Sequence, residues 1–598
     1  MSGPDALSLN AQAALGAVRE PERSQTAHLV RHFLERFFNH ETASPDGDAK
    51  ARLVLIAVAT GLPPFIVAMY LWPLYHPFIG WPPGQHPAGP PPYWLQVNHH
   101  FFFVLYSFVA MGIITVFEWD LFFPDLLDVF VLGPLPVPER RVFLARLAAI
   151  SLFIFGFLLD ANLLAPVVLP MATDPPQLLR LVAGDVVAVA AGGLFSAAFI
   201  LALQGLLLAV LGERLFRRIS LAVQGLAVVA LVVLMLLFPV LSGVTPGLLQ
   251  SGIAAVRWFP PFWFLGMFQR ILEGPAALPV FAQLSRIGAT ATLAAGAIAL
   301  AVYPLAYLRR VRALVEGAEA RSTRNWAAAP LNGFLRATLV RPPVRRAVFH
   351  FIGQTLLRVP RYRIYLVLYG GVGLSVVAAA VLRFSMDGQL LRVGVSADGI
   401  RVSVGIVAFW VIAGLRTAFV SSGNQNGSWA MRIVHGRPPH FAAAIEQLLA
   451  AKVWVALCAG AVTLAMILLL RQVAPAELLA TRATAAQLLV AAGMCILLTD
   501  AFFMNVTVIP FTGTREPSNL AFTLLKYFSF FPLVAPLSIV SQFLIERSGR
   551  NFGIAAAVVV VIHLWFRKRH RDAVRLNSEQ IELEEDEEEF PMRLGLRY

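Results

Sequence analysis

The sequence predicts an all-α polytopic membrane protein of about 12 transmembrane helices, arranged as two parallel six-helix repeats with the N and C termini cytoplasmic. Three observations lead to this fold class. Apolar residues make up 58% of the 598 residues and charged residues only 14%, against about half and about a quarter in soluble chains. Many apolar stretches have the length of a membrane span. The loops between these stretches are alternately rich and poor in arginine.

A span needs about 20 predominantly apolar residues to cross a hydrocarbon core of about 30 Å. Six candidates precede a polar gap and six follow it, at 53–72, 99–118, 147–168, 186–210, 220–241, 287–307, 364–382, 403–420, 453–470, 485–508, 521–543 and 552–566. They divide the chain into a cytoplasmic N-terminal segment (1–52), a first six-span unit (53–307), a basic cytoplasmic linker (308–363), a second six-span unit (364–566) and a cytoplasmic tail, first basic and then acidic (567–598).

The basic residues predict the orientation. With the N-terminus inside, 36 of the 48 Lys and Arg residues lie on the cytoplasmic side, 11 lie outside and Arg416 lies within a span. The 36 include Lys526, which lies near the cytoplasmic end of the span 521–543. Loops rich in Lys and Arg stay in the cytoplasm. The net charge of +13 is therefore explained by membrane topology, and nucleic acid is not expected as a partner. The expected location is a bacterial inner membrane, with membrane lipid around the spans.

Two features recur in both units. An amphipathic helix is expected before the first span of each unit, and such helices lie in the membrane interface, as anchors or as contacts for a cytoplasmic partner. Trp119 and Trp429 follow the second span of each unit, 310 residues apart. Six spans is an even number, so both units enter from the same side and the repeat is parallel. The apolar stripes of the two helices are Leu29, Val30, Phe33, Leu34, Phe37 and Phe38, and Val348, Phe349, Phe351, Ile352, Leu356 and Leu357.

The loop at 119–146 contains a short amphipathic segment, a Leu-Pro-Val turn from Leu135, and two arginines before the chain re-enters the membrane. It resembles the loop between the second and third spans of ABC-2-type exporter permeases. An aromatic string around a Pro-Pro pair, 259–266, lies between spans five and six, where that family has short external helices. The segment 509–519 and the acidic tail resemble those of large bacterial membrane proteins described as ABC-exporter-like permeases.

The resemblance implies the permease of an exporter, with two fused six-span units and a separate cytoplasmic P-loop ATPase subunit that binds ATP and Mg²⁺. The second cytoplasmic loop, 421–452, departs from the family because it lacks the Leu-Pro-Val turn. The chain itself has no G-x-x-x-x-G-K-[ST], H-E-x-x-H, G-x-S-x-G or C-x-x-C motif, so we expect no enzyme activity, cofactor or metal on it. The residues expected to couple to the ATPase are Trp119, Leu135, Pro136, Arg140, Arg141, Trp429 and Arg432.

Polar side chains inside spans are candidates for a substrate path, because each of them is costly in lipid. Asp185 and Arg416 lie near predicted span ends, where hydration or snorkelling favours a structural role. The remaining polar residues are the candidates for the path: Asp160, Asn162, Asp500 and Asn505.

Three other functions remain open. A proton-driven secondary transporter would use Asp160 and Asp500 as proton relays. A membrane enzyme acting on lipid or glycan at the outer surface would use a group of external histidines, whose spacing fits no metal signature: His76, His86, His99 and His100. A non-transporting scaffold would need none of these. The sequence identifies neither the substrate nor the oligomeric state.

Overall fold

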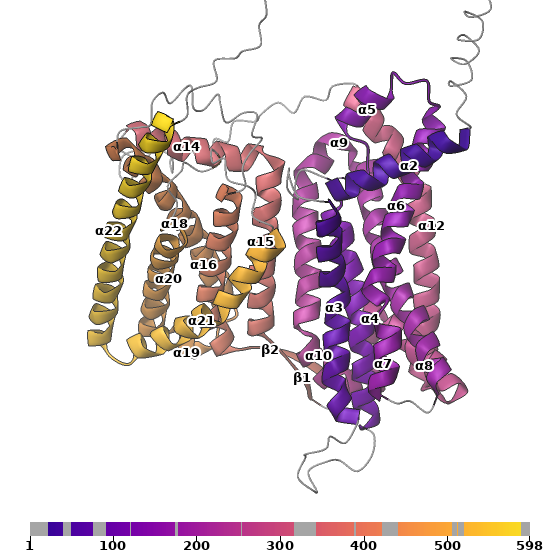
Figure 1. Cartoon of the computed structure of the whole chain (residues 1–598). Helices are drawn as coiled ribbons and strands as arrows, with labels where there is room; N and C mark the ends of the chain where they lie inside the picture. Colours follow the sequence, from indigo (N-terminus) through magenta and orange to yellow (C-terminus); the bar gives the residue numbers. More distant parts are fainter. Residues whose placement is uncertain are drawn as a thin grey trace, which may run out of the picture.

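The computed structural model describes residues 22–39, 49–75, 91–119, 121–173, 177–252, 254–315, 343–387, 390–420, 441–504, 511 and 520–587. These residues are nearly all helical, and the helices form two bundles that stand side by side (Figure 1). Ten helices within the described ranges are long and apolar enough to cross a membrane. The chain is therefore an all-α multi-pass membrane protein, as the sequence predicts.

The first bundle contains α2 (Glu22–Asn39), α3 (Ala49–Tyr75), α4 (Tyr93–Phe117), α5 (Leu126–Leu132), α6 (Glu139–Asn162), α7 (Ala165–Thr173), α8 (Leu178–Gly184), the π-helical turn η1 (Asp185–Val189), α9 (Ala190–Leu236), α10 (Phe238–Gln250), the 3₁₀ turns η2 (Ala254–Trp258) and η3 (Gly274–Ala276), α11 (Pro260–Glu273) and α12 (Pro279–Val315).

The second bundle contains α14 (Pro343–Arg358), α15 (Pro360–Val381), β1 (Leu382–Asp387), β2 (Leu390–Val395), α16 (Ala397–Val420), α18 (Phe441–Arg471), α19 (Ala476–Leu479), α20 (Thr481–Phe502), α21 (Leu520–Glu546) and α22 (Gly549–Glu587).

The ten membrane-crossing helices coincide with ten of the predicted spans. Several extend beyond the predicted ends, because the helix continues past its apolar part, as α12 does to Val315. The two other predicted spans fall on α3, which covers 53–72, and on α15, whose apolar stretch Tyr365–Val381 is shorter. The number of twelve spans remains a prediction.

The helix α9 combines two predicted spans, 186–210 and 220–241, in one unbroken helical stretch. Ser196 and Leu231 both lie against Gly112 of α4: a Cβ atom on this glycine would be 2.6 Å from Ser196 Oγ and 2.8 Å from Leu231 Cδ1. A straight helix would separate these two residues by about 50 Å. The chain therefore reverses its direction within α9, between the candidate spans Leu178–Leu211 and Ile219–Leu236.

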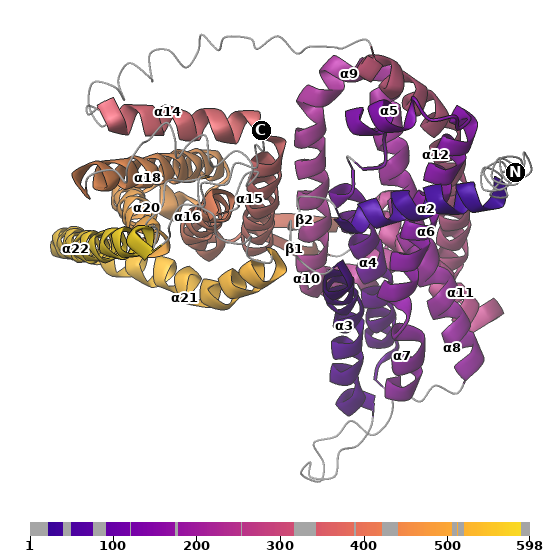
Figure 2. The same cartoon turned by 45° about the horizontal axis from the view of Figure 1, so that its top comes forward.

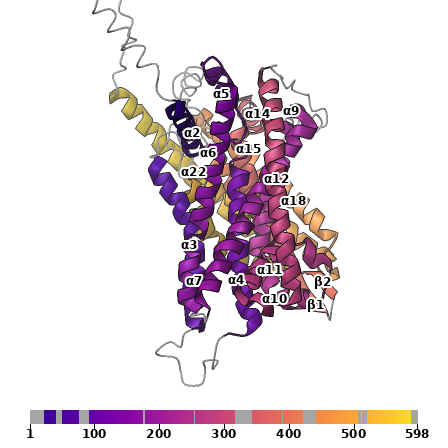
Figure 3. The same cartoon turned by 90° about the vertical axis from the view of Figure 1, so that its right-hand side faces the viewer.

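The helices α2 and α14 lie across the ends of their bundles (Figure 2), as expected for amphipathic helices at a membrane interface. Each packs against the third predicted span of its unit, α2 against α6 and α14 against α18. The predicted stripes face inward where their side chains are described: Phe33 and Phe37 are buried in the first helix, and Val348 and Ile352 in the second. With α5, the two helices lie at one end of the molecule, and the β-hairpin lies at the other (Figures 1 and 3).

Each bundle has its own hydrophobic core, and the bundles pack together through α9 and α15. In this contact the Ser375 hydroxyl of α15 donates a hydrogen bond of 3.3 Å to the carbonyl oxygen of Val229. Between the predicted spans 364–382 and 403–420, for which no strand was predicted, the structure has the antiparallel hairpin β1–β2, whose Met386 reaches Gly247 of α10. The sequence contains a hairpin signal here, the dipeptide Asp387-Gly388.

The aromatic string 259–266 begins α11, which follows α10 between the fifth and sixth predicted spans. Phe264 and Phe268 of α11 are fully buried, and both lie against glycines, Gly192 of α9 and Gly184 of α8. The absence of side chains on these glycines lets the aromatic rings approach the helix backbones closely. This part of the string thus belongs to the core of the first bundle and not to an aromatic belt at the membrane surface.

Candidate functional site

The loop at 119–146 is anchored at its start by Trp119, which is 1% exposed. The indole lies parallel to the ring of Phe216 in α9, with 6.5 Å between ring centroids. The Gln204 side-chain amide of α9 donates a hydrogen bond to the Trp119 carbonyl oxygen. Trp119, predicted to couple to an ATPase, therefore has no surface to offer a partner and instead fixes the loop to α9.

The same loop is anchored at its end by Arg146, which is 3% exposed at the start of the third span. Its guanidinium donates hydrogen bonds to the carbonyl oxygens of Leu121 (2.8 Å) and Phe123 (2.6 Å). It also forms a 2.7 Å ion pair with Asp128 of α5. One side chain thus ties both the backbone and the short helix of the loop to α6.

Asp128 also pairs with Arg36 of α2, so the amphipathic helix, the loop and the third span share one network. Burial alone would raise the pKa of Asp128, but the attraction of Arg146 and Arg36 outweighs burial and holds the pKa below its ordinary value. The carboxylate is therefore ionised at neutral pH. Arg36 and Arg146 were not singled out in the sequence, because the partner of each is distant along the chain.

The opposite side of the loop is exposed and largely apolar. Phe130 and Val131 of α5 and Leu135 of the turn are 67%, 62% and 47% exposed. Pro136 and Arg140 beside them are also exposed. We call these five residues the loop surface. It lies at the end of the molecule that also carries α2 and α14 (Figure 1).

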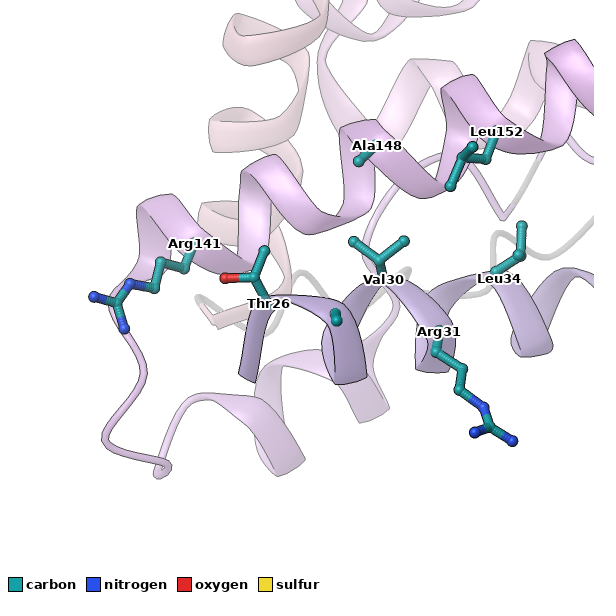
Figure 4. A pocket seen from close by; sticks show the side chains of 8 residues that line it. Thr26, Val30, Arg31, Leu34, Arg141, Ala148 and Leu152 are labelled. Atoms are coloured by element: carbon teal, nitrogen blue, oxygen red, sulfur yellow. The ribbon is translucent and has the colours of Figure 1, made fainter. Parts of the chain in front are cut away.

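Arg141, the remaining described coupling candidate, lines an open groove of ≈ 790 Å³ between α2 and α6. Figure 4 shows Val30 and Leu34 of α2 facing Ala148 and Leu152 of α6 across this groove. Arg141 is half-buried, whereas Arg140 is exposed. The two neighbouring arginines therefore have different surroundings, and only Arg140 belongs to the loop surface.

Two of the substrate-path candidates lie near the end of α6. Asp160 accepts a hydrogen bond from the Thr60 hydroxyl of α3, and the Tyr106 hydroxyl of α4 donates to the Thr60 carbonyl oxygen. The Asn162 side chain bonds back to its own helix at the Leu158 carbonyl oxygen, at 2.7 Å. Asp160 therefore joins α6 to α3, and Thr60 joins α3 to α4, whereas Asn162 makes a local contact.

Asp500 lies in α20 of the second bundle and is 4% exposed. It forms an ion pair with Lys452 of α18 at 3.2 Å, and one of its oxygens lies 2.5 Å from Nδ1 of His563 in α22. Asp160 and Asp500 are in different bundles, and neither is on α9 or α15, through which the bundles pack. Lys452 and His563 were missed in the sequence, although a basic residue opening span nine and a histidine within span twelve were available signals.

The two described external histidines have separate partners. His99 Nδ1 lies 2.9 Å from the Tyr75 hydroxyl, and His100 Nδ1 lies 2.9 Å from the Gln269 amide nitrogen.

The remaining polar candidates have other outcomes. Arg416 donates a hydrogen bond to the Phe502 carbonyl oxygen at 2.9 Å. Within the described ranges no group of three His, Cys, Asp or Glu side chains is placed to hold a metal ion. Trp429, Arg432, Asn505, His76 and His86 lie outside the described residues.

Compared with known proteins, the chain matches no family model, no curated protein and no solved structure. The functional argument therefore depends on the residues and their geometry.

Glu118, at the end of α4 beside Trp119, makes the stability of the loop depend on pH. Burial raises its pKa to about 8, from 4.5 in an unfolded chain. Between these two values the folded protein binds one proton more than the unfolded chain, so its stability falls as pH rises through this window. We expect the apparent melting temperature of the purified protein to fall from about pH 5 to about pH 8.

The variant Glu118→Gln carries no titrating group at this position and should lose that part of the pH dependence. Melting curves of the two proteins, recorded in one detergent over the same pH range, measure the difference. Parallel curves for the wild type and the variant would contradict the assignment to Glu118.

Proposed function

We propose that this chain is the membrane-spanning permease subunit of an ABC-2-like exporter, with two six-span units fused in one polypeptide. A separate cytoplasmic P-loop ATPase would bind ATP and Mg²⁺ and supply the energy. The loop surface carries the proposal. An exposed apolar patch of Phe130, Val131 and Leu135 is held on a loop that buried charges tie to two membrane-associated helices. Contiguous exposed apolar patches are typical of the sites at which one protein binds another.

Force applied to the loop surface would reach the bundle through few bonds. The pairs of Asp128 with Arg36 and Arg146 link α5 to α2 and α6, and the Tyr303 hydroxyl of α12 donates to the Phe122 carbonyl oxygen at 2.8 Å. A displaced loop would therefore move these helices together. In the second unit, α14 packs on α18 as α2 does on α6, which supports a parallel repeat.

This proposal includes the finer points of topology and location. We propose twelve spans on the basis of the apolar stretches, and cytoplasmic termini on the basis of the distribution of the basic residues. The bacterial inner membrane is proposed because of the resemblance to bacterial exporter permeases. The loop surface, α2 and α14 would then face the cytoplasm together (Figure 1). The chain would act as a permease without enzyme activity of its own, and its spans would contact membrane lipid.

A charged side chain within the loop surface should prevent the ATPase from binding. We expect Phe130→Glu and Leu135→Glu each to reduce the amount of P-loop ATPase that co-purifies with the tagged chain about 30-fold, because a lost central contact costs about 2 kcal/mol. The measurement is a pull-down from native membranes in mild detergent, followed by a vanadate-sensitive ATPase assay.

The matched control is Leu390→Glu, which places the same charge on an equally exposed leucine of the β-hairpin, at the other end of the molecule. It should leave co-purification unchanged. A wild-type chain that co-purifies with no ATPase, or loop variants that retain it, would contradict the proposal.

The second candidate is a proton-driven secondary transporter, and one observation favours it. Buried Asp500 contacts both Lys452 and His563, which places three ionisable groups from three helices together, and such groups within membranes often mark proton pathways. In this case the chain would purify without an ATPase. Flux driven by a pH gradient would then be lost in Asp500→Asn and retained in Phe130→Glu.

A further inference from the structure

Asp185 is a buried ionisable residue that the proposed function leaves unused. It opens the π-helical turn η1, seven residues after the start of α8, and is 1% exposed. Neither of its carboxyl oxygens has a hydrogen-bond partner among the described residues. The sequence suggested a hydrated side chain near a span end, whereas the structure places this carboxyl group in the packed interior.

A carboxylate ion in such surroundings is strongly disfavoured, because burial removes its hydration shell and no described side chain forms a hydrogen bond to it. A neutral carboxyl group costs far less to bury. The π-helical turn adds a second unusual feature, since single π turns within α-helices occur frequently at functional sites. Burial and backbone geometry thus point to the same residue.

The turn η1 packs against α4 and α11. Gly184, the residue before Asp185, lies close to Phe268 of α11: a Cβ atom on this glycine would be 3.3 Å from the Phe268 carbonyl oxygen. The Phe268 ring stacks on His100 of α4, with ring centroids 4.5 Å apart and an interplanar angle of 17°. His100 is 5% exposed and Gln269 is 1% exposed. The turn η1 thus packs against the two helices that carry these buried polar side chains.

The register of α4 along α9 places Asp185 at the level of His100. Gly193 lies against Ser107 and Met111, and Gly112 lies against Ser196. The two helices therefore run parallel, and the difference in residue number between facing positions is nearly constant. If the same difference in residue number holds toward the start of α4, Asp185 lies opposite His100 and its neighbour Phe101. The two titratable groups therefore share one depth in the bundle.

His100 does not act as a cation toward Asp185. The Gln269 amide nitrogen is a donor, so the His100 Nδ1 atom 2.9 Å away accepts and the imidazole is neutral, with its proton on Nε2. The other ionisable groups on α4, α8 and α11 have partners of their own, whereas α7 carries none. These pairs are His99 with Tyr75, Arg180 with Gln177, Arg270 with the Gly274 carbonyl oxygen and Glu273 with Tyr93.

We propose that Asp185 and the His100–Gln269 pair form a proton-binding site, with the proton carried on Asp185 in the conformation described. The ligand is a proton for two reasons. A proton needs no cavity in the packed interior, and its binding neutralises the carboxylate. Release would turn the carboxyl group into a carboxylate and pass the proton to water from the nearer membrane face, when α11 moves away. The helix α11 lies between Gly252 and Gly274, two glycines with positive φ, which can absorb such a movement.

The site is also connected to the 119–146 loop. The helix that begins at Asp185 continues into α9, where Gln204 holds the Trp119 carbonyl oxygen, about 28 Å farther along the helix. A shift of η1 on proton release would therefore be transmitted to the loop. The proton site goes beyond the exporter proposal and holds whether or not an ATPase drives the chain.

Infrared spectroscopy of the full-length chain in lipid nanodiscs tests the site directly. A protonated carboxyl group has a carbonyl stretch above the amide I band, which a carboxylate lacks. Because the carboxyl group of Glu118 is also protonated at neutral pH, the experiment uses Glu118→Gln as its parent protein. At neutral pH we expect this band in Glu118→Gln and its loss in Glu118→Gln/Asp185→Asn. It should shift in D₂O and disappear as the pH is raised. Gln269→Leu, which removes the donor to His100, should move the midpoint of this titration.

The control is Asp160→Asn, which removes a carboxyl group that already accepts a hydrogen bond from Thr60 and should leave the titrating band in place. If Asp185→Asn does not fold, Asp185→Ser replaces it, and its spectrum is compared with that of the parent protein in the same way. A Glu118→Gln spectrum without this band would overturn the proposal. So would a band that never exchanges in D₂O, which indicates a permanently buried acid, or one abolished by Na⁺ at constant pH, which indicates a metal-cation site.

Discussion

Replacing Arg146 by alanine should lower the stability of the folded protein by about 3 kcal/mol. The substitution leaves the buried Asp128 with Arg36 as its remaining cationic partner, and it removes the donor to the carbonyl oxygens of Leu121 and Phe123. Losing one partner of a buried ion pair costs about 3–5 kcal/mol of folding stability. The expected loss lies at the lower end of this range, because Asp128 keeps its ion pair with Arg36. The measurement is the apparent melting temperature of the purified chain, together with the yield of monodisperse protein.

Arg140→Ala is the matched control, because Arg140 lies on the same helix and is exposed. Its effect should stay within about 0.5 kcal/mol. The double variant Asp128→Asn/Arg146→Ala should be less destabilised than the sum of the single variants, since it leaves no unpaired buried charge. Equal melting temperatures for Arg146→Ala and Arg140→Ala would show that the network does not stabilise the loop.

The second large effect is expected where α15 meets α16. Gly373 of α15 lies against Trp410, whose Cβ would be 2.7 Å from a Cβ at position 373, and Gly414 of α16 meets Tyr369 in the same way, also at 2.7 Å. Helices in membranes associate closely through such small residues. Gly373→Ala should therefore separate the two backbones and cost about 1–3 kcal/mol, measured as a lower apparent melting temperature and a lower folded yield.

Gly370, one turn earlier on α15, provides the control, because a Cβ atom there would meet no atom within 4 Å. Gly370→Ala should be neutral or stabilising by up to about 1 kcal/mol, since alanine is the better helix former. Because α15 is also the helix that packs on α9, Gly373→Ala should weaken the joint between the bundles. If both alanine variants melt alike, close packing at Gly373 is not what holds α15 to α16.

Much of the fold could be predicted because hydropathy and charge act locally. Each apolar stretch must be long enough for the membrane, and each cluster of arginines favours one side, wherever the neighbouring helices lie. The stripes containing Phe33 and Ile352 could be predicted for the same reason, since one helix turn repeats every 3.6 residues. The reversal within α9 lies between the predicted spans 186–210 and 220–241, as the sequence predicts. The hairpin β1–β2 could not be predicted in this way, because it depends on tertiary contacts such as that of Met386 with Gly247.

The candidate site was predicted only in part. Leu135, Pro136 and Arg140 lie on the exposed side of the loop, as contacts for a partner require, whereas Trp119 is buried beneath it. Asp500 was identified as an unusual residue, but its partners Lys452 and His563 come from helices 48 and 63 residues away in the chain. A sequence pattern shows that such a charge needs a partner, but it does not show which one it has.

The sequence by itself determined that this protein crosses a membrane many times and where most of its helices lie, because the transfer of apolar segments into lipid depends on composition. The tertiary structure alone decided which polar groups are buried, paired or left without a partner. Arg146 became the anchor of the loop, and Asp185 a carboxyl group without a partner, through helices that meet only after packing. Burial and pairing are properties of the assembled bundle, and the cost of a buried charge depends on both.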